Sequence, residues 1–256
     1  MAEFGTNKTA KLIKSLKEKK YRDKEGLFVV EGERFVGEIM DNCEIEFMVF
    51  SESYAALKDV SEYKKAFVFS DKIFKEFSET SNPQGIIAVC RKKTFSIDEV
   101  IEKNAGEIYI LAEELNDPGN LGTIIRTADA SGAAAVILSK GSVDLYNGKV
   151  LRSTMGSLFH IPVIENADIK QCIEKLKKSG ITVFAAHLKG DRTLYDCNFK
   201  NPSAFVIGNE ARGLSDETSK ICDVLLKIPM PGKAESLNAA VAASVMMYEA
   251  VRQRMF

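Results

Sequence analysis

The sequence predicts an α/β protein built from two consecutive domains. Of its 256 residues, 45% are hydrophobic, which is enough for a sizeable core and argues against disorder. Short apolar runs typical of strands alternate with helical patterns, and a polar stretch near residues 92–104 interrupts this alternation. We therefore expect a first domain over residues 1–92, a linker over 93–105 and a second domain over 106–256.

A strongly basic segment opens the chain. Residues 8–24 contain eight Lys and Arg against one Glu and one Asp, a local charge of +6. Leu12, Ile13 and Leu16 recur at helical spacing, so the segment is expected to form an amphipathic helix with a cationic outer face. Such a face either binds the phosphates of a nucleic acid or is simply a solvated surface, and charge alone leaves both interpretations open.

The rest of the first block has the pattern of a small α/β domain, because strand-like runs are separated by helical stretches. Its expected strands are Leu27–Val30, Ile45–Phe50, Ala66–Phe69 and Ile86–Cys90. Its expected helices lie near residues 33–41, 52–58 and 71–78.

The second block repeats this alternation with more strands, which favours a parallel sheet covered by helices on both faces. Its expected strands are Glu107–Leu111, Ala134–Leu138, Ile161–Ile164, Ile181–Ala186, Ala204–Ile207 and Val224–Ile228. Its expected helices lie near residues 121–131, 168–179 and 236–252.

Composition excludes several classes of protein. No apolar run approaches the roughly 18 residues that a membrane span needs, and the N-terminus lacks the apolar core of a signal peptide. The five cysteines form no CxxC pair, and their odd number is untypical of a disulfide framework, so we expect reduced thiols in a cytoplasmic protein. The two histidines, His160 and His187, do not have the spacing of a zinc motif.

The segment Leu111–Arg126 is the first of three that carry chemistry. An apolar strand ends in a turn rich in Asn, Asp, Pro and Gly, and a helix is expected to begin near Leu121 with Asn120 as its N-cap. Gly122 then lies in the first turn, where another surface can approach closely. Arg126 is a charged residue on a helix of small apolar side chains, so it has either a functional role or a structural carboxylate partner.

Two later strands also end in polar loops. Gly208, Asn209 and Glu210 follow an apolar strand, and ligands of parallel α/β sheets bind at such carboxyl ends. Glu210 is placed there to hold a cation or to orient an arginine, although the glycines alone also suit an ordinary turn. The third segment begins at Ile228 and leads to an apolar final helix, which Ser236 or Asn238 can cap.

Together the three segments resemble the signature motifs of the SpoU/TrmH branch of the SPOUT RNA methyltransferases. The matching residues are Asn120, Gly122 and Arg126 in motif one, Gly208, Asn209, Glu210 and Gly213 in motif two, and Ile228, Pro229, Met230, Ser236, Leu237 and Asn238 in motif three. The three motifs occur in order, which makes the resemblance highly specific. Phe28–Gly32 resembles the L30e-like substrate-binding domain that is often joined to this catalytic domain. The family often has Gly after the motif-two Glu, where this chain has Ala211.

The resemblance implies an enzyme that transfers a methyl group from S-adenosylmethionine to a ribose 2′-hydroxyl of RNA. The additional N-terminal domain favours ribosomal RNA as the substrate. The resemblance also implies a SPOUT-type α/β knot, in which the C-terminal region forms a trefoil knot, and a homodimer formed through the C-terminal domain. The methyl donor needs no metal, so no metal site is expected.

The resemblance also assigns residues to the site. Its implied catalytic residues are Arg126, Glu210, Asn238, Asn120 and Ser236. The pKa of arginine, above about 12, makes a neutral Arg126 costly, so we expect its guanidinium to act as an electrostatic and orienting group held by Glu210. The implied cofactor contacts are Gly208, Ile228, Leu237 and Met230.

An RNA methyltransferase needs a surface that binds the phosphates of RNA independently of the RNA sequence. This requirement favours an RNA contact over a solvated surface for the basic helix. The expected RNA-binding residues are Lys14, Lys17, Lys20 and Arg22.

Three other functions can be compared with this pattern of motifs. A catalytically silent RNA-binding protein with the same fold is separated from an enzyme by its binding of S-adenosylmethionine. A methyltransferase directed at transfer RNA shares every motif named above. A Rossmann dehydrogenase is disfavoured, because the chain lacks a GxGxxG motif after a first strand with an acidic residue further on.

Overall fold

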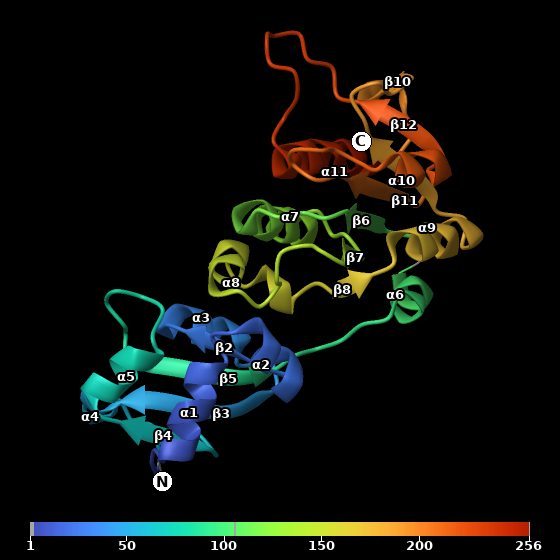
Figure 1. The fold of residues 1–256 in the computed structure, drawn as a ribbon. Helices are drawn as coiled ribbons and strands as arrows, with labels where there is room; N and C mark the ends of the chain where they lie inside the picture. Colours follow the sequence, from blue (N-terminus) through green and yellow to red (C-terminus); the bar gives the residue numbers. More distant parts are fainter. Residues whose placement is uncertain (1–2, 105, 256) are drawn as a thin grey trace. The chain divides into compact units, whose positions relative to one another are not determined.

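The computed structural model describes residues 3–104 and 106–255, which form two compact units (Figure 1). One unit comprises the residues up to Lys93 together with Tyr146–Arg152, and the other comprises Thr94–Leu145 and the residues from Ser153 onward. Each unit has its own sheet and its own buried core. No helix in the described ranges is both long enough and apolar enough to cross a membrane.

The first unit contains a five-stranded mixed sheet in the order β1-β4-β3-β5-β2. β4 pairs in parallel with β1 and β3, whereas β5 is antiparallel to β2 and β3. The four strands expected in this block are confirmed to within a residue at each end. The elements are β1 Glu3–Phe4, α1 Asn7–Ser15, α2 Lys19–Glu25, β2 Leu27–Glu31, α3 Glu33–Ile39, β3 Ile45–Ser51, α4 Glu52–Leu57, β4 Ala66–Phe69, α5 Asp71–Phe77 and β5 Ile86–Arg91.

The basic segment folds as two helices, so the expectation of one amphipathic helix over residues 8–24 was wrong. α1 ends at Ser15, and Arg22 of α2 is only 5% exposed. The Arg22 guanidinium donates through Nη1 to the carbonyl oxygens of Leu16 (2.6 Å) and Lys17 (2.7 Å). The chain can turn after α1 because Arg22 satisfies carbonyls that follow the helix end, where intrahelical partners run out.

The second unit contains a seven-stranded sheet in the order β10-β12-β9-β11-β6-β7-β8, and every strand pair in it is parallel. This confirms the predicted parallel sheet. Its elements are α6 Ile97–Asn104, β6 Ile108–Ala112, α7 Pro118–Ala130, β7 Ala135–Ser139, α8 Gly148–Thr154, β8 Val163–Ala167, α9 Ile169–Lys178, β9 Thr182–Ala186, β10 Arg192–Thr193, β11 Ser203–Ile207, α10 Asp216–Ile221, β12 Val224–Lys227 and α11 Ala239–Met255, with short 3₁₀ turns at Ser157–Phe159 and Leu194–Asp196. The division between the units passes within α8.

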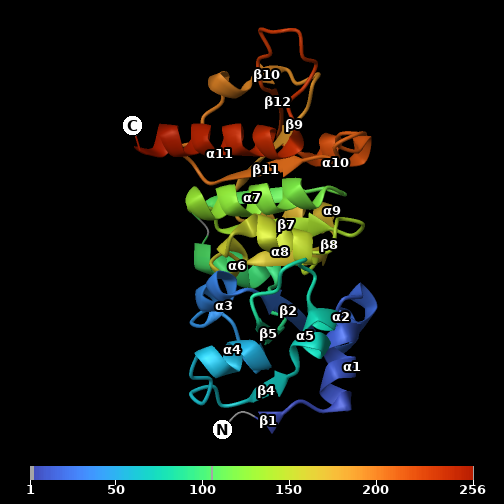
Figure 2. The same ribbon diagram turned by 90° about the vertical axis from the view of Figure 1, so that its left-hand side faces the viewer.

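Helices cover both faces of this sheet. α7 and α11 lie side by side in both views and pack against each other, and α11 also contacts β11 and β6 (Figures 1 and 2). α6 and α9 bury their apolar residues in the core on the other face. α6 occupies most of the segment expected to be a linker, because Ile97, Val100 and Ile101 are buried in that core.

Candidate active site

The parallel pairing brings the three motif segments to one edge of the sheet. β12, β9, β11 and β6 are consecutive neighbours, so their carboxyl ends lie at the same edge. The register pairs Ile207 with Ala112 and Leu226 with Ala186 near these ends. The loops that follow β6, β11 and β12 are the segments that contain the three motifs, and this is the edge where open α/β sheets bind ligands.

The motif-one helix starts three residues earlier than expected. α7 begins at Pro118, and its N-cap is Asp117, whose carboxylate accepts a hydrogen bond from the Asn120 backbone N–H at 2.8 Å. The assignment of Asn120 as the N-cap was therefore wrong. The Asn120 side chain instead projects from the first turn, is 9% exposed and contacts the other two motifs.

Hydrogen bonds join the three motifs to one another. The Glu210 carboxylate accepts from the backbone N–H groups of Asn116 (3.1 Å) and Asp117 (2.9 Å) and from Asn120 Nδ2 (3.0 Å). Asn120 Oδ1 accepts in turn from Asn238 Nδ2 at 2.9 Å. Asn238 Oδ1 accepts from the Ala240 backbone N–H at 2.9 Å at the start of α11, as expected of a cap.

This network keeps Glu210 ionised. Burial would by itself raise the pKa of the Glu210 carboxyl. The hydrogen bonds donated by the Asn120 side chain and by the neighbouring backbone N–H groups outweigh burial, and they hold that pKa below its ordinary value of 4.5. Glu210 is therefore an anionic anchor for the motif-one turn at neutral pH.

Arg126 stands apart from this network. It is exposed, and it forms no hydrogen bond or ion pair with any residue in the ranges 3–104 and 106–255. The expected grip of Glu210 on its guanidinium does not form within the chain. Arg126 follows Asn120 by six helical positions, which turns their side chains about 120° apart and displaces them by about 9 Å along α7. Arg126 therefore presents its guanidinium to solvent.

Two acidic residues that the sequence interpretation missed hold the motif-two loop. Glu113 accepts hydrogen bonds from the backbone N–H of Ser215 (2.8 Å), the Ser215 hydroxyl (2.9 Å) and the Thr218 hydroxyl. Glu114 forms an ion pair with Arg212. The sequence did contain a signal for this role, because Glu113 and Glu114 are adjacent carboxylates that directly follow an apolar strand.

Glu114 also has an unusual backbone conformation, with φ at +50°. Its N–H donates to Ser139 Oγ at 2.7 Å, and its carbonyl accepts from Asn209 Nδ2 at 2.7 Å. Asn209 Oδ1 accepts from the backbone N–H groups of Ala211 (3.0 Å) and Arg212 (3.1 Å). Asn209 thus shapes its own loop and holds Glu114 of motif one in its strained backbone conformation. Strained residues of this kind are often found at functional sites.

Two glycines permit close contacts at the site. A Cβ atom on Gly122 would lie 2.2 Å from Ser153 Cβ, which confirms the close approach expected at that position. A Cβ atom on Gly208 would lie 2.2 Å from the carbonyl carbon of Gly213, because the motif-two loop folds back on itself through two backbone hydrogen bonds between Asn209 and Gly213.

We predict that Gly208→Ala destabilises the protein by about 1–3 kcal/mol, because backbone atoms and not a flexible side chain must move to admit the methyl group. Thermal unfolding measures the change. Gly232→Ala is the matched control, since a Cβ atom there would have no neighbour within 4 Å. Equal melting temperatures for the two variants would refute the explanation.

The motif-three segment is unlike the other two. Ile228, Met230 and Leu237 are half-buried, whereas Ser236 is exposed. Residues 228–237 form no hydrogen bond with one another or with any other part of the chain that the structure describes. Figure 2 shows this segment as a loop that projects beyond β12 before it returns to α11. Its backbone donors and acceptors are therefore available to a ligand or to water.

The expected RNA-binding residues differ in how far they are free to bind. Lys14 forms an ion pair with Glu76, and Lys20 pairs with Glu18 at 3.2 Å, both at the surface. Lys17 Nζ donates to the carbonyls of Glu76 (2.9 Å) and Ser78 (3.1 Å), so it caps the end of α5. Arg22 is buried, and we leave it out of the RNA-binding set for that reason.

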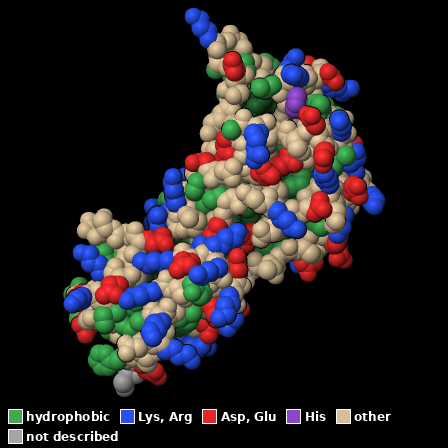
Figure 3. Space-filling view, in the orientation of Figure 1, with side chains coloured by type: hydrophobic (Ala, Val, Ile, Leu, Met, Phe, Trp, Pro, Cys, Tyr) green, Lys and Arg blue, Asp and Glu red, His purple; other side chains and the backbone are tan. Residues whose placement is uncertain are grey.

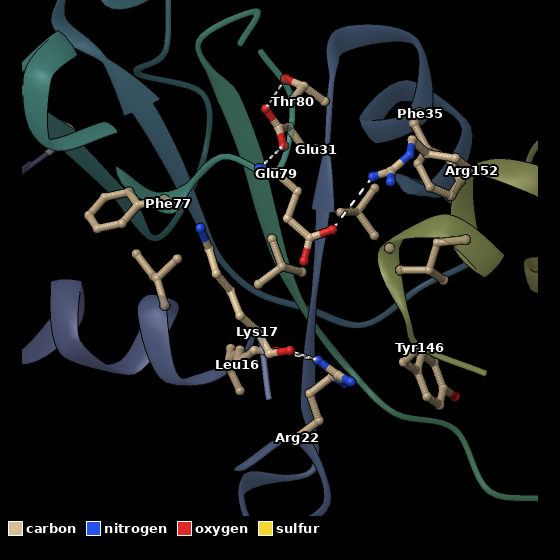
Figure 4. Close-up of a pocket in the computed structure, with 15 residues that line it drawn as sticks. Leu16, Lys17, Arg22, Glu31, Phe35, Phe77, Glu79, Thr80, Tyr146 and Arg152 are labelled. Atoms are coloured by element: carbon tan, nitrogen blue, oxygen red, sulfur yellow. Dashed lines mark hydrogen bonds and ion pairs between the residues drawn. The ribbon is translucent and has the colours of Figure 1, made fainter. Parts of the chain in front are cut away.

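A cavity of about 40 Å³ lies within the first unit (Figure 4). Its lining includes Lys17, Arg22 and Glu31, and Glu31 accepts hydrogen bonds from the Thr80 hydroxyl (2.9 Å) and the Glu79 backbone N–H (3.0 Å). This volume holds about one water molecule and is too small for a nucleobase or a methyl donor. No group of three or more His, Cys, Asp or Glu in residues 3–104 and 106–255 is arranged to hold a metal ion.

Comparison with known families fits this geometry. The model of the SpoU rRNA Methylase family matches residues 107–248, and the model of the MRM3-like substrate binding domain matches residues 7–88. These matches define the class of protein as an RNA methyltransferase with a separate substrate-binding domain. The chain belongs to the SpoU rRNA methylase family, and the resemblance found in its three motifs is confirmed.

Individual relatives extend over nearly the whole chain. The 23S rRNA (guanosine(2553)-2′-O)-methyltransferase RlmP of Bacillus subtilis is 36% identical over 249 residues, which are 96% of this chain and 97% of the relative. The AdoMet-bound rRNA methyltransferase of Sinorhizobium meliloti has a TM-score of 0.85 at 31% identity, covering 98% of this chain and 97% of that one. The SpoU methyltransferase AviRb of Streptomyces viridochromogenes, in complex with AdoMet, has a TM-score of 0.85 at 28% identity, covering 98% of this chain and 99% of that one.

Proposed function

We propose that this protein transfers the methyl group of S-adenosylmethionine to the 2′-hydroxyl of a ribose in ribosomal RNA. The observation that carries the proposal is the hydrogen-bonded chain from Glu210 through Asn120 to Asn238, which holds three distant motifs at one edge of the sheet. Ribosomal RNA is favoured over transfer RNA because the B. subtilis relative, named for 23S rRNA, matches nearly the whole chain, including the first unit.

The residues present fit the methyl donor. Ile228, Met230 and Leu237 offer half-buried apolar surface, and the unpaired backbone groups of residues 228–237 offer donors and acceptors beside it. Such a combination suits a ligand with a flat apolar ring and polar edges. We assign Gly208 to the same site because its loop follows β11, which is separated from β12 only by β9. When bound, S-adenosylmethionine supplies an electrophilic methyl group on a sulfonium.

Arg126 is the proposed catalytic residue. Its exposed guanidinium, without a partner among the described residues, is free to stabilise negative charge that develops on the ribose oxygen or to bind the adjacent phosphate. Glu210, Asn120 and Asn238 hold the three motif segments together, and we assign Ser236, which is exposed on the motif-three segment, to a contact with the substrate. Orientation of the two reacting atoms supplies the rest of the rate enhancement.

We further propose that two copies pair through the second unit and that this unit contains the trefoil knot. The solvent-facing side of α11 supports the pairing, since Val241 (46% exposed) and Tyr248 (51% exposed) leave apolar surface uncovered in a single chain. Arg126 belongs to α7, the helix that packs against α11. The five free thiols suit a reducing compartment, and we place the reaction in the cytoplasm.

The first unit is proposed to grip RNA through the exposed lysines of α1 and α2. Figure 3 shows basic and acidic side chains interspersed over the visible face of this unit, so the grip depends on local lysines and not on a uniformly positive surface. Lys14 and Lys20 remain candidates because both side chains are exposed, at 45% and 67%. Lys17 is left out of this proposal because its ammonium group already donates to carbonyls at the end of α5.

Reversing the charge of both lysines (Lys14→Glu, Lys20→Glu) is expected to weaken RNA binding and to reduce the slope of log K against log salt by about 2, one for each lost phosphate contact. Fluorescence anisotropy with an rRNA fragment at several salt concentrations measures this slope. Lys64→Glu, an exposed lysine of the same unit outside the two helices, is the control. An unchanged slope for the double variant would assign the grip to another surface.

Ribose-methylation mapping tests the function in cells. Total RNA from a strain that lacks the gene is expected to lose one 2′-O-methyl mark in rRNA, which the wild-type gene restores. A catalytically silent RNA-binding protein would leave every mark in place, and a tRNA methyltransferase would remove a mark from tRNA.

A further inference from the structure

We propose that His160 is a positioning residue that keeps Arg126 available for catalysis by holding Asp129 away from it. The inference rests on the function proposed for Arg126. α7 contains only two charged residues, Arg126 and Asp129, and the structure describes this helix in full. Their spacing of three residues places both side chains on neighbouring positions of one helix face, where an Arg and an Asp attract each other.

The two charges nevertheless do not pair. Asp129 Oδ2 lies 3.0 Å from Nδ1 of His160, and Arg126 has no ion-pair partner among residues 3–104 and 106–255. His160 directly follows the 3₁₀ turn Ser157–Phe159, which packs against α7. The imidazole therefore reaches Asp129 from a neighbouring segment of the same unit.

Asp129 needs such a partner for a second reason. It lies one residue before the end of α7, where the negative end of the helix dipole disfavours an anion. Because a carboxylate only accepts hydrogen bonds, the contact requires a proton on His160 Nδ1, which the protonated ring carries and which the neutral ring carries in its Nδ1–H tautomer. Without this donor, Arg126 is the only cation that α7 itself offers to Asp129.

An ion pair between Arg126 and Asp129 would impair the reaction. The carboxylate would offset the charge of the guanidinium and turn it along the helix instead of toward the substrate. We expect His160→Ala to lower kcat about two- to fivefold, the range that an exposed ion pair of this kind supports, with KM for S-adenosylmethionine unchanged. His160→Asn, whose amide can donate from a similar position, should retain most of the wild-type kcat.

The decisive experiment is rescue. The double variant His160→Ala/Asp129→Asn removes the competing charge and is expected to recover the wild-type kcat. A low kcat in the double variant would show that His160 acts by packing, and a wild-type kcat in His160→Ala would show that it has no role; either result overturns the inference.

A second readout does not depend on activity. The Nε–H signal of Arg126 in ¹⁵N NMR spectra should shift in His160→Ala and return in the double variant, because it reports a new contact with the carboxylate. If wild-type protein fails to methylate rRNA, the proposed function fails while this measurement still decides the contact. If methylation is normal and the Arg126 signal does not move, only the role of His160 is refuted.

Discussion

Replacing Arg126 with alanine is expected to lower kcat for RNA methylation by about two to three orders of magnitude, the usual effect of removing one group that stabilises charge in a transition state. Binding of S-adenosylmethionine should stay within about twofold of wild type, because Arg126 lies on α7 outside the motif-three segment proposed to hold the donor. Stability should also be unaffected, since the exposed guanidinium forms no hydrogen bond or ion pair with the described residues.

Single-turnover methylation of an rRNA fragment and calorimetry with S-adenosylmethionine measure the two effects separately. Arg126→Lys is the informative control, because it keeps the charge but loses the planar fork of the guanidinium. We expect intermediate activity from it. Near-normal methylation by Arg126→Ala, with the donor still bound, would remove Arg126 from the mechanism.

Glu210→Ala is expected to weaken binding of S-adenosylmethionine by more than tenfold and to lower the melting temperature by several degrees. The substitution removes three hydrogen bonds, two to the motif-one turn and one to Asn120. Hydrogen bonds to a charged group contribute about 1.5–3 kcal/mol each. Solvent screens these interactions because Glu210 is exposed, so we expect a combined loss of only about 2 kcal/mol in the free energy that holds the site together.

Glu210→Gln separates charge from shape, because the amide keeps one acceptor but places a donor against the backbone N–H groups. Its loss of affinity for S-adenosylmethionine should be smaller than that of Glu210→Ala.

The lowered pKa of Glu210 also predicts a dependence on pH. The stabilisation by its carboxylate is present above pH 4.5 and is lost as the pH falls through the lowered pKa. Donor affinity that is insensitive to Glu210→Ala at pH 7 would contradict the anchoring role.

The sequence alone was sufficient to predict the alternation of strands and helices, because buried parallel strands are short, apolar and bounded by polar turns. Gly122 is an instructive example, since its place in a small-residue helix predicted the close approach that Ser153 makes. The order of the strands was not predictable in the same way. Pairing β11 with both β6 and β9 joins residues about 95 and 20 positions apart, and no local pattern encodes that choice.

The partners of the charged residues were the harder part of the site. Asn120 and Asp117 are both good caps, and only the structure shows that Asp117 takes the role and leaves Asn120 for Glu210 and Asn238. A basic stretch likewise does not reveal that Arg22 turns inward to satisfy carbonyls of its own chain. Such choices depend on packing between segments, which local charge and spacing do not specify.

Incubation of the purified protein with methyl-labelled S-adenosylmethionine and rRNA from a strain lacking the gene tests the central proposal most directly. After nuclease digestion, the label is expected in a single 2′-O-methylated nucleoside, and the Arg126→Ala protein should yield almost none. Label on a base, or no label with donor and RNA both bound, would contradict the assignment of a ribose methyltransferase.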